Sequence, residues 1–321
     1  MPRLNTISAT AALALTVLVY SSGVSAATQV VTSTKPLELL VRAVAGEDVE
    51  ITTLVPAGAS PHTYNMRPSQ RRALENADVI FWVGPEMESF LSRLLAGEDF
   101  HQRTIMLMQD GDDHPEANHG HQEHASHDDD LQSGTHETAG HDHGEGEDPH
   151  IWLDPSLALE MVRTVHGALA NMKGANTQAL NENLTRFEAN LEKTERQVRA
   201  KLETAVHDIS LFAYHSAFTR FASHYDLPLE GVLTLNPELS PGARHISEVQ
   251  DKLHKANHPC LLIEPQFNRQ WWRSITRGLE VTFSTWDPLA TDIQVTADGY
   301  NVFQHSIADA VLKCLPENTQ H

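Results

Sequence analysis

Short apolar runs alternate with amphipathic helical patterns along this chain of 321 residues, and they do so twice, before and after one long helical segment. The strand-like runs are residues 30–32, 50–55, 79–83 and 104–108 in the first half and 209–213, 229–233, 260–263 and 281–284 in the second. Strands that alternate with helices pair in parallel, because each helix returns the chain to the same end of the sheet. The sequence therefore predicts an α/β fold with two lobes, each with a mainly parallel sheet flanked by helices.

One apolar stripe marks the longest helical segment. Its members recur at helical spacing: Leu180, Leu184, Phe187, Leu191, Val198 and Leu202. We expect a helix over residues 177–206 that connects an N-terminal lobe, residues 27–176, to a C-terminal lobe, residues 207–321. A coiled coil is the alternative, but only about three heptads are present and the flanking pattern is α/β.

Residues 110–148 form a tract with eight histidines, thirteen acidic residues and neither lysine nor arginine. With almost no aliphatic side chains the tract cannot bury a core, so we expect a disordered loop inserted in the N-terminal lobe. Imidazole and carboxylate are ligands that zinc accepts, which favours weak metal capture over a passive charged linker. The histidines concerned are His114, His119, His121, His124, His127, His136, His141 and His143.

The acidity of the chain is concentrated in this tract. The formal net charge is −20, and the thirteen acidic residues of the tract account for −13 of it. Such a charge repels nucleic acid and anionic lipid and attracts cations. We therefore expect no nucleic-acid partner.

The first 26 residues have the pattern of a secretory signal peptide. Arg3 precedes an apolar run at residues 11–20, and Val24-Ser25-Ala26 provides the small residues of a cleavage site after Ala26. A transmembrane anchor is the alternative, but the run is shorter than the roughly 20 residues that a span needs. No cysteine follows the run, which argues against a lipid anchor there. We expect an exported, soluble chain that is not embedded in the membrane.

The chain has two cysteines, Cys260 and Cys314. In an exported chain an isolated pair favours a disulfide bond. Two free thiols that bind zinc are the alternative.

Three histidines outside the tract lie in turn-rich segments near the ends of expected strands. These are His62, His150 and His215, and Asp287 follows the strand expected at residues 281–284. Ligands of open α/β sheets bind beyond the carboxyl ends of the strands, where such segments converge. A single histidine in such a place is more often a turn or core residue, but three imidazoles and one carboxylate together fill a tetrahedral zinc shell.

Glu264 also follows an expected strand. Three roles are open to it: a second carboxylate at the metal, a partner that orients a ligating histidine, or a surface acid. We favour the orienting role.

Five short segments resemble one family. They are residues 58–64 (GASPHTY), 83–88 (VGPEME), 148–153 (DPHIWL), 264–267 (EPQF) and 287–289 (DPL). Together they resemble the metal-binding proteins of bacterial zinc ABC importers, of the ZnuA type within the cluster A-I solute-binding proteins. The resemblance covers essentially all of the chain after the expected signal peptide.

The resemblance implies a metal held in a cleft between two lobes. His62, His150 and His215 match the family's three histidine ligands, and Asp287 matches its carboxylate. Manganese-binding relatives carry glutamate where this chain has His215, which favours Zn²⁺ over Mn²⁺. Ser216 and Phe218 differ from the aspartate and tyrosine expected there, so the surroundings of the ligands differ from the family pattern.

The function implied is capture of Zn²⁺ in the periplasm by a monomer, for delivery to an inner-membrane ABC permease, without catalysis. A secreted zinc hydrolase with Glu264 as general base is one alternative, although a closed set of three histidines and one aspartate leaves no open coordination position. A periplasmic metal buffer without a transporter is another.

Overall fold

The computed structural model describes five segments of the chain. The described residues are 27–108, 148–203, 209–234, 241–267 and 270–316. The expected signal peptide and all eight histidines of the tract lie outside them. The last residue assigned to the tract, Asp148, lies inside them and belongs to the folded chain.

The N-terminal lobe contains a four-stranded sheet in which every pairing is parallel. Its strand order is β2-β1-β3-β4. The strands are β1 (Thr28–Thr32), β2 (Val49–Thr53), β3 (Val79–Trp82) and β4 (Thr104–Met106). The helices are α1 (Lys35–Ala45), α2 (Pro68–Asn76), α3 (Ser89–Leu95) and α4 (Pro155–Ala170).

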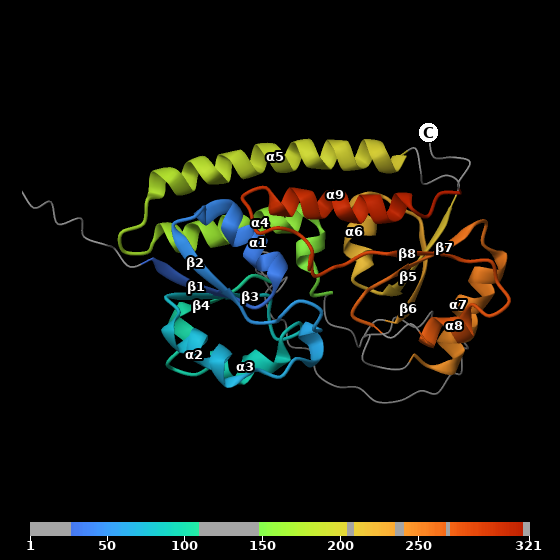
Figure 1. Ribbon diagram of the computed structural model, residues 1–321, viewed down its shortest axis with the longest axis horizontal. Coiled ribbons are helices and arrows are strands. Elements are labelled where there is room, and N and C mark those ends of the chain that lie inside the picture. Colours follow the sequence, from blue (N-terminus) through green and yellow to red (C-terminus); the bar gives the residue numbers. More distant parts are fainter. Residues whose placement is uncertain (1–26, 109–147, 204–208, 235–240, 268–269, 317–321) are drawn as a thin grey trace, which may run out of the picture.

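Helices cover both faces of this sheet (Figure 1). Successive side chains of a strand point to opposite faces. Val31 and Ile80 accordingly pack in a cluster with Leu74 of α2, whereas their neighbours Val30 and Phe81 join the cluster that contains α1 and α4. Burial on both faces explains why these strands are continuous apolar runs in the sequence.

The C-terminal lobe repeats the arrangement with strand order β6-β5-β7-β8, again with parallel pairing throughout. The strands are β5 (Ser210–His215), β6 (Leu229–Thr234), β7 (Pro259–Ile263) and β8 (Thr282–Thr285). The helices are α6 (Phe218–His224), α7 (Ala243–Lys255), α8 (Gln270–Ile275) and α9 (Gly299–Leu312). The expected fold class, two parallel α/β lobes, is confirmed.

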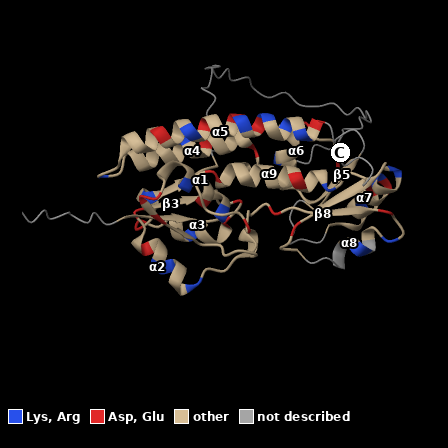
Figure 2. Ribbon diagram, turned by 45° about the horizontal axis from the view of Figure 1, so that its top comes forward, with Lys and Arg blue, Asp and Glu red and all other residues tan. Residues whose placement is uncertain are grey.

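Helix α5 (Thr177–Glu203) is the expected connecting helix, and residues 204–206 of the expected range lie outside the described residues. Its apolar stripe faces the core: Leu180, Phe187, Leu191, Val198 and Leu202 are buried, and Leu184 is partly buried. Charges of both signs are interspersed along α5, with ion pairs such as Arg196–Glu192 (Figure 2).

The C-terminal helix α9 is a second element that crosses between the lobes. It runs beside α5 and also contacts α1 (Figure 1). At its first residue the approach is so close that a Cβ atom on Gly299 would lie 2.7 Å from the Gln294 carbonyl and 2.9 Å from Cδ2 of Leu39. Glycine is therefore required where α9 begins. The sequence pattern had assigned this helix to the C-terminal lobe alone.

A single hydrophobic cluster continues through both lobes. Leu40 of α1, Leu191 of α5, Phe303 of α9 and Leu262 of β7 all belong to it. Buried hydrogen bonds reinforce this junction: Nε1 of Trp152 donates to the Pro288 carbonyl at 2.8 Å. A shared, close-packed core limits how far the lobes can separate.

Cys260 and Cys314 form a disulfide bond, as expected, and free thiols are excluded as zinc ligands. The bond joins β7 to the second residue after the end of α9, so it ties α9 to the C-terminal sheet.

Among the helices that the structure describes, none combines the length and apolar character needed to cross a membrane.

Glu88 is a fully buried carboxyl group at the carboxyl ends of β1 and β3. It accepts hydrogen bonds from Oγ of Ser33 and from the backbone N–H of Gly84, at 3.1 Å for the latter. Its own backbone N–H donates to the Gly84 carbonyl at 2.9 Å. This turn explains why α3 begins at Ser89.

Replacing Glu88 with glutamine is expected to flatten the pH dependence of stability. Burial raises the pKa of Glu88 to about 7, against the effect of its hydrogen bonds. The folded protein therefore holds a proton that the unfolded chain releases, so this contribution to stability is complete below the unfolded pKa of 4.5 and is lost as pH rises to about 7. The free energy of unfolding should fall by about 2 kcal/mol more in the wild type than in Glu88→Gln between pH 5 and pH 8.

Urea unfolding of both proteins at the two pH values measures this difference. Glu86→Gln, which removes an exposed carboxylate from the same turn, is the matched control and should behave as the wild type. Parallel pH curves for the wild type and Glu88→Gln would show that Glu88 is ionised in the folded state at pH 5.

Candidate metal centre

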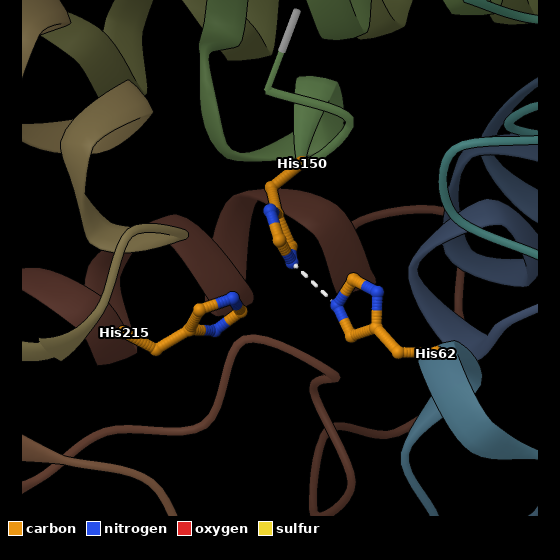
Figure 3. Close-up of side chains that lie close together, drawn as sticks. All are labelled: His62, His150 and His215. Carbon is orange, nitrogen blue, oxygen red and sulfur yellow. Dashed lines mark hydrogen bonds between the residues drawn. The ribbon is translucent and has the colours of Figure 1, made fainter. Parts of the chain in front are cut away.

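Three histidines from separate segments meet between the lobes (Figure 3). His62 lies in the short 3₁₀ turn η1 (Pro61–Thr63) that follows β2. His150 directly precedes the turn η3 (Ile151–Leu153). His215 is the last residue of β5, in the other lobe. One ring nitrogen from each lies within 4.8 Å of the others.

The spacing of these nitrogens suits a tetrahedral metal ion. Nε2 of His62 and Nε2 of His150 are 3.3 Å apart. Two nitrogens bound at 2.0–2.1 Å with a tetrahedral angle between them are separated by about 3.3 Å. The ring of His215 lies against that of His150, with 4.7 Å between their centroids.

Burial keeps the imidazoles of His62 and His150 neutral. His150 and His215 are only 4% and 2% exposed. Burial, together with the neighbouring rings of His150 and His215, lowers the pKa of His62 to about 3. The pKa of His150 is also lowered, mainly by burial. Neutral imidazole is the form that binds a metal, so no proton has to leave these two rings at neutral pH.

Asp148 fixes the orientation of His150. Its Oδ1 lies 2.6 Å from Nδ1 of His150 and also accepts the His150 backbone N–H at 3.1 Å. Burial would raise the pKa of Asp148, but the hydrogen bond from His150 and the charge of Arg220 lower it overall, so it stays ionised. Nδ1 of His150 therefore carries the proton, and Nε2 is left to face the other rings.

The sequence pattern did not assign this role to Asp148. It counted the residue as the end of the acidic tract, where it is one carboxylate among thirteen. Its position two residues before His150 is the feature of the sequence from which this role could have been predicted.

Glu264 lies beside His215. Its Oε1 is 3.3 Å from Nδ1 of His215, and the two side chains are almost completely buried. Neither ring nitrogen of His215, nor this Glu264 oxygen, has a hydrogen-bond partner among the described residues. Buried polar atoms without partners cost free energy, of order 1–3 kcal/mol each, and are expected where a ligand completes the site. This position suits the orienting role expected for Glu264, with Nε2 of His215 left for a metal.

The carboxylate of Asp287 is hydrogen-bonded mostly within its own loop. Its Oδ1 accepts hydrogen bonds from Nε2 of Gln266 at 2.6 Å and the Leu289 N–H at 3.0 Å, and its Oδ2 accepts the Thr291 N–H at 2.7 Å. It is not part of the group of mutually close ligand atoms formed by the three histidines. A carboxylate oxygen accepts two bonds, so Oδ2 has one lone pair left. Ligation by Asp287 stays a prediction, and Oδ2 is the atom that would make it.

Two parallel α/β lobes, joined by one long helix, with imidazoles from both lobes meeting between them, define a helix-linked solute-binding protein. The family model of ZnuA, described as zinc-uptake complex component A periplasmic, matches residues 30–314. The chain belongs to this family.

Curated relatives agree with the family model. The chain is 33% identical over 302 residues to the high-affinity zinc uptake system protein ZnuA of Yersinia pestis, a match that covers 90% of this chain and 92% of that protein. It is 28% identical over 337 residues to the ZnuA protein of Haemophilus influenzae, covering 94% and 97%. A crystal structure of ZnuA has the same fold, with a TM-score of 0.66 at 22% identity over 89% of this chain and 99% of that one.

Proposed function

We propose that this protein binds Zn²⁺ between its lobes and delivers it to an ABC permease for uptake. The observation that carries the proposal is the set of three buried imidazoles, contributed by both lobes, with two nitrogens at the spacing of a tetrahedral zinc site. His62, His150 and His215 would be ligands, with Oδ2 of Asp287 as the fourth. Glu264 would orient His215 through its Nδ1.

Family membership supports the cellular setting of this proposal. The family is the periplasmic component of a zinc-uptake complex. We infer export of this chain by residues 1–26 as a signal peptide, and action as a monomer that docks on an inner-membrane permease. The acidic charge of the chain gives nucleic acid no favourable surface.

The geometry favours transport over hydrolysis. A zinc hydrolase needs an open coordination position and a general base beside the bound water. Glu264 instead faces Nδ1 of a candidate ligand, His215, where it supports that ring. A metal buffer without a transporter would use the same site. Normal growth of a deletion strain under zinc starvation would favour the buffer.

Deleting residues 113–147 is expected to spare one tight zinc site and remove several weak ones. The proposed tight site uses residues of the two lobes, whereas the histidines of the tract are expected to add only weak ligands. Calorimetric titration of the mature protein and the deletion variant with Zn²⁺ measures both classes of site. A second titration in the presence of Mn²⁺ tests the preference for zinc.

The control for the deletion is a variant of the tract in which its eight histidines are changed to glutamine and its length and charge are kept. It should also retain one tight site. Loss of the tight site in either variant would place that site in the tract and contradict the proposal.

A further inference from the structure

Helix α6 links the segments that carry His150 and His215, the two candidate ligands whose ring centroids are closest together. It begins three residues after His215 and carries Arg220 and His224 four residues apart, on the same side of the helix. This side faces residues 148–154, the segment that carries His150, and α6 packs against the turn η3 within that segment.

Arg220 is hydrogen-bonded to the first residue of this segment. Its guanidinium donates two hydrogen bonds to the backbone carbonyl of Asp148, one of them from Nε at 3.1 Å. The carboxylate of the same Asp148 accepts the hydrogen bond from Nδ1 of His150. Arg220 therefore fixes the peptide from which the partner of His150 projects.

His224 contacts the last residue of the segment. Its Nδ1 lies 3.0 Å from Oδ1 of Asp154, and its Nε2 lies 2.8 Å from Oε1 of Glu195 on α5. Burial alone would lower the pKa of His224, but the hydrogen bonds to the two carboxylates raise it to about 9. Both ring nitrogens thus donate at neutral pH. Asp154 in turn caps α4 by accepting the Ser156 N–H at 2.7 Å.

We propose that Arg220 and His224 are positioning residues, a clamp through which α6 fixes His150 opposite His215 across the two lobes. The proposal rests on the zinc-binding function proposed above. The clamp secures both ends of a seven-residue segment to the helix that begins three residues after His215, so α6 sets the distance between the two ligands.

Arg199 on α5 provides a matched control for Arg220. It binds the same helix, α6, also through its guanidinium. It donates a hydrogen bond to the His224 carbonyl at 3.0 Å and forms an ion pair with Asp226 at 3.1 Å. It does not hold residues 148–154. Loss of Arg199 therefore weakens the attachment of α6 without releasing the His150 segment.

The test is the zinc affinity of Arg220→Ala, His224→Gln and Arg199→Ala, measured by competition with a chelator. We expect about tenfold weaker binding for the first two, as is usual when a group that supports a metal ligand is lost, and a change of less than about twofold for Arg199→Ala. In a His150→Ala background, Arg220→Ala should cause no further loss, because the ligand that it positions is gone.

An equal loss in both backgrounds would show that Arg220 acts only on general stability and would overturn the proposal. Unchanged affinity of both clamp variants in the wild-type background would also overturn it. If circular dichroism shows that Arg220→Ala does not fold, Arg220→Lys replaces it; a lysine keeps one donor to the Asp148 carbonyl and should bind zinc with intermediate affinity. Absence of tight zinc binding by the wild type would instead count against the proposed function.

Discussion

Replacing His150 with alanine is expected to weaken zinc binding by about 100- to 1000-fold. Four-ligand zinc sites in proteins bind with about 10–16 kcal/mol, so one ligand carries roughly 3–4 kcal/mol, which is that range of affinity. His150 is the ring closest to both others, at 4.7 Å from His215 and 5.3 Å from His62 between centroids. Its loss also leaves Asp148 without the imidazole that it orients.

The matched control is His166→Ala. His166 is also an imidazole with a hydrogen-bond partner, Asn181, but it lies within helix α4 and is not one of the three clustered histidines. Its loss should leave zinc affinity within twofold of the wild type. Thermal unfolding of both metal-free variants separates any loss of folding from loss of a ligand. Tight binding by a folded His150→Ala protein would place the site elsewhere.

Removing the disulfide bond is expected to lower the free energy of unfolding by about 4 kcal/mol. The bond closes a chain segment with a sequence separation of 54, and the loop-closure entropy of a segment of this length corresponds to about that value. Both cysteines are buried, so the double variant Cys260→Ala/Cys314→Ala preserves an apolar interior at these positions. Because the bond ties α9 to β7, its loss also loosens a helix that crosses between the lobes.

Urea unfolding of the wild type, with and without reducing agent, and of the double variant measures the effect. The reduced wild type and the double variant should unfold at similar, lower urea concentrations, and the reducing agent should not change the variant further. An unchanged unfolding midpoint after complete reduction of the wild type would show that the bond does not contribute to equilibrium stability.

The local sequence pattern was sufficient to predict the helices and strands of the fold. Helix α2 (Pro68–Asn76), for example, begins at a proline, which is favoured in the first turn of a helix, and a strand follows it directly. The expected parallel sheets and the disulfide are confirmed. Turn-rich segments after strands also indicated which histidines to consider, since loops at the carboxyl ends of parallel strands converge.

Contacts between distant residues could not be predicted in this way. The role of α9 depends on pairs such as the Tyr300 hydroxyl with the Trp152 carbonyl, 148 positions apart in the chain, which leave no local periodic signal. The same holds for the clamp on α6, whereas Asp148 lies only two residues before His150 and could have been recognised from that position. Asp287 shows the reverse case: the sequence identified the carboxylate, but only the structure shows that three hydrogen bonds leave one lone pair, on Oδ2, for a ligand.

We predict that one zinc ion sits between the lobes. The most direct test is a crystal structure of the mature protein loaded with one equivalent of Zn²⁺, with anomalous diffraction recorded at the zinc absorption edge. We expect one dominant anomalous peak about 2.0–2.1 Å from Nε2 of each of His62, His150 and His215. A dominant peak at any other position, with these three imidazoles unliganded, would contradict the account.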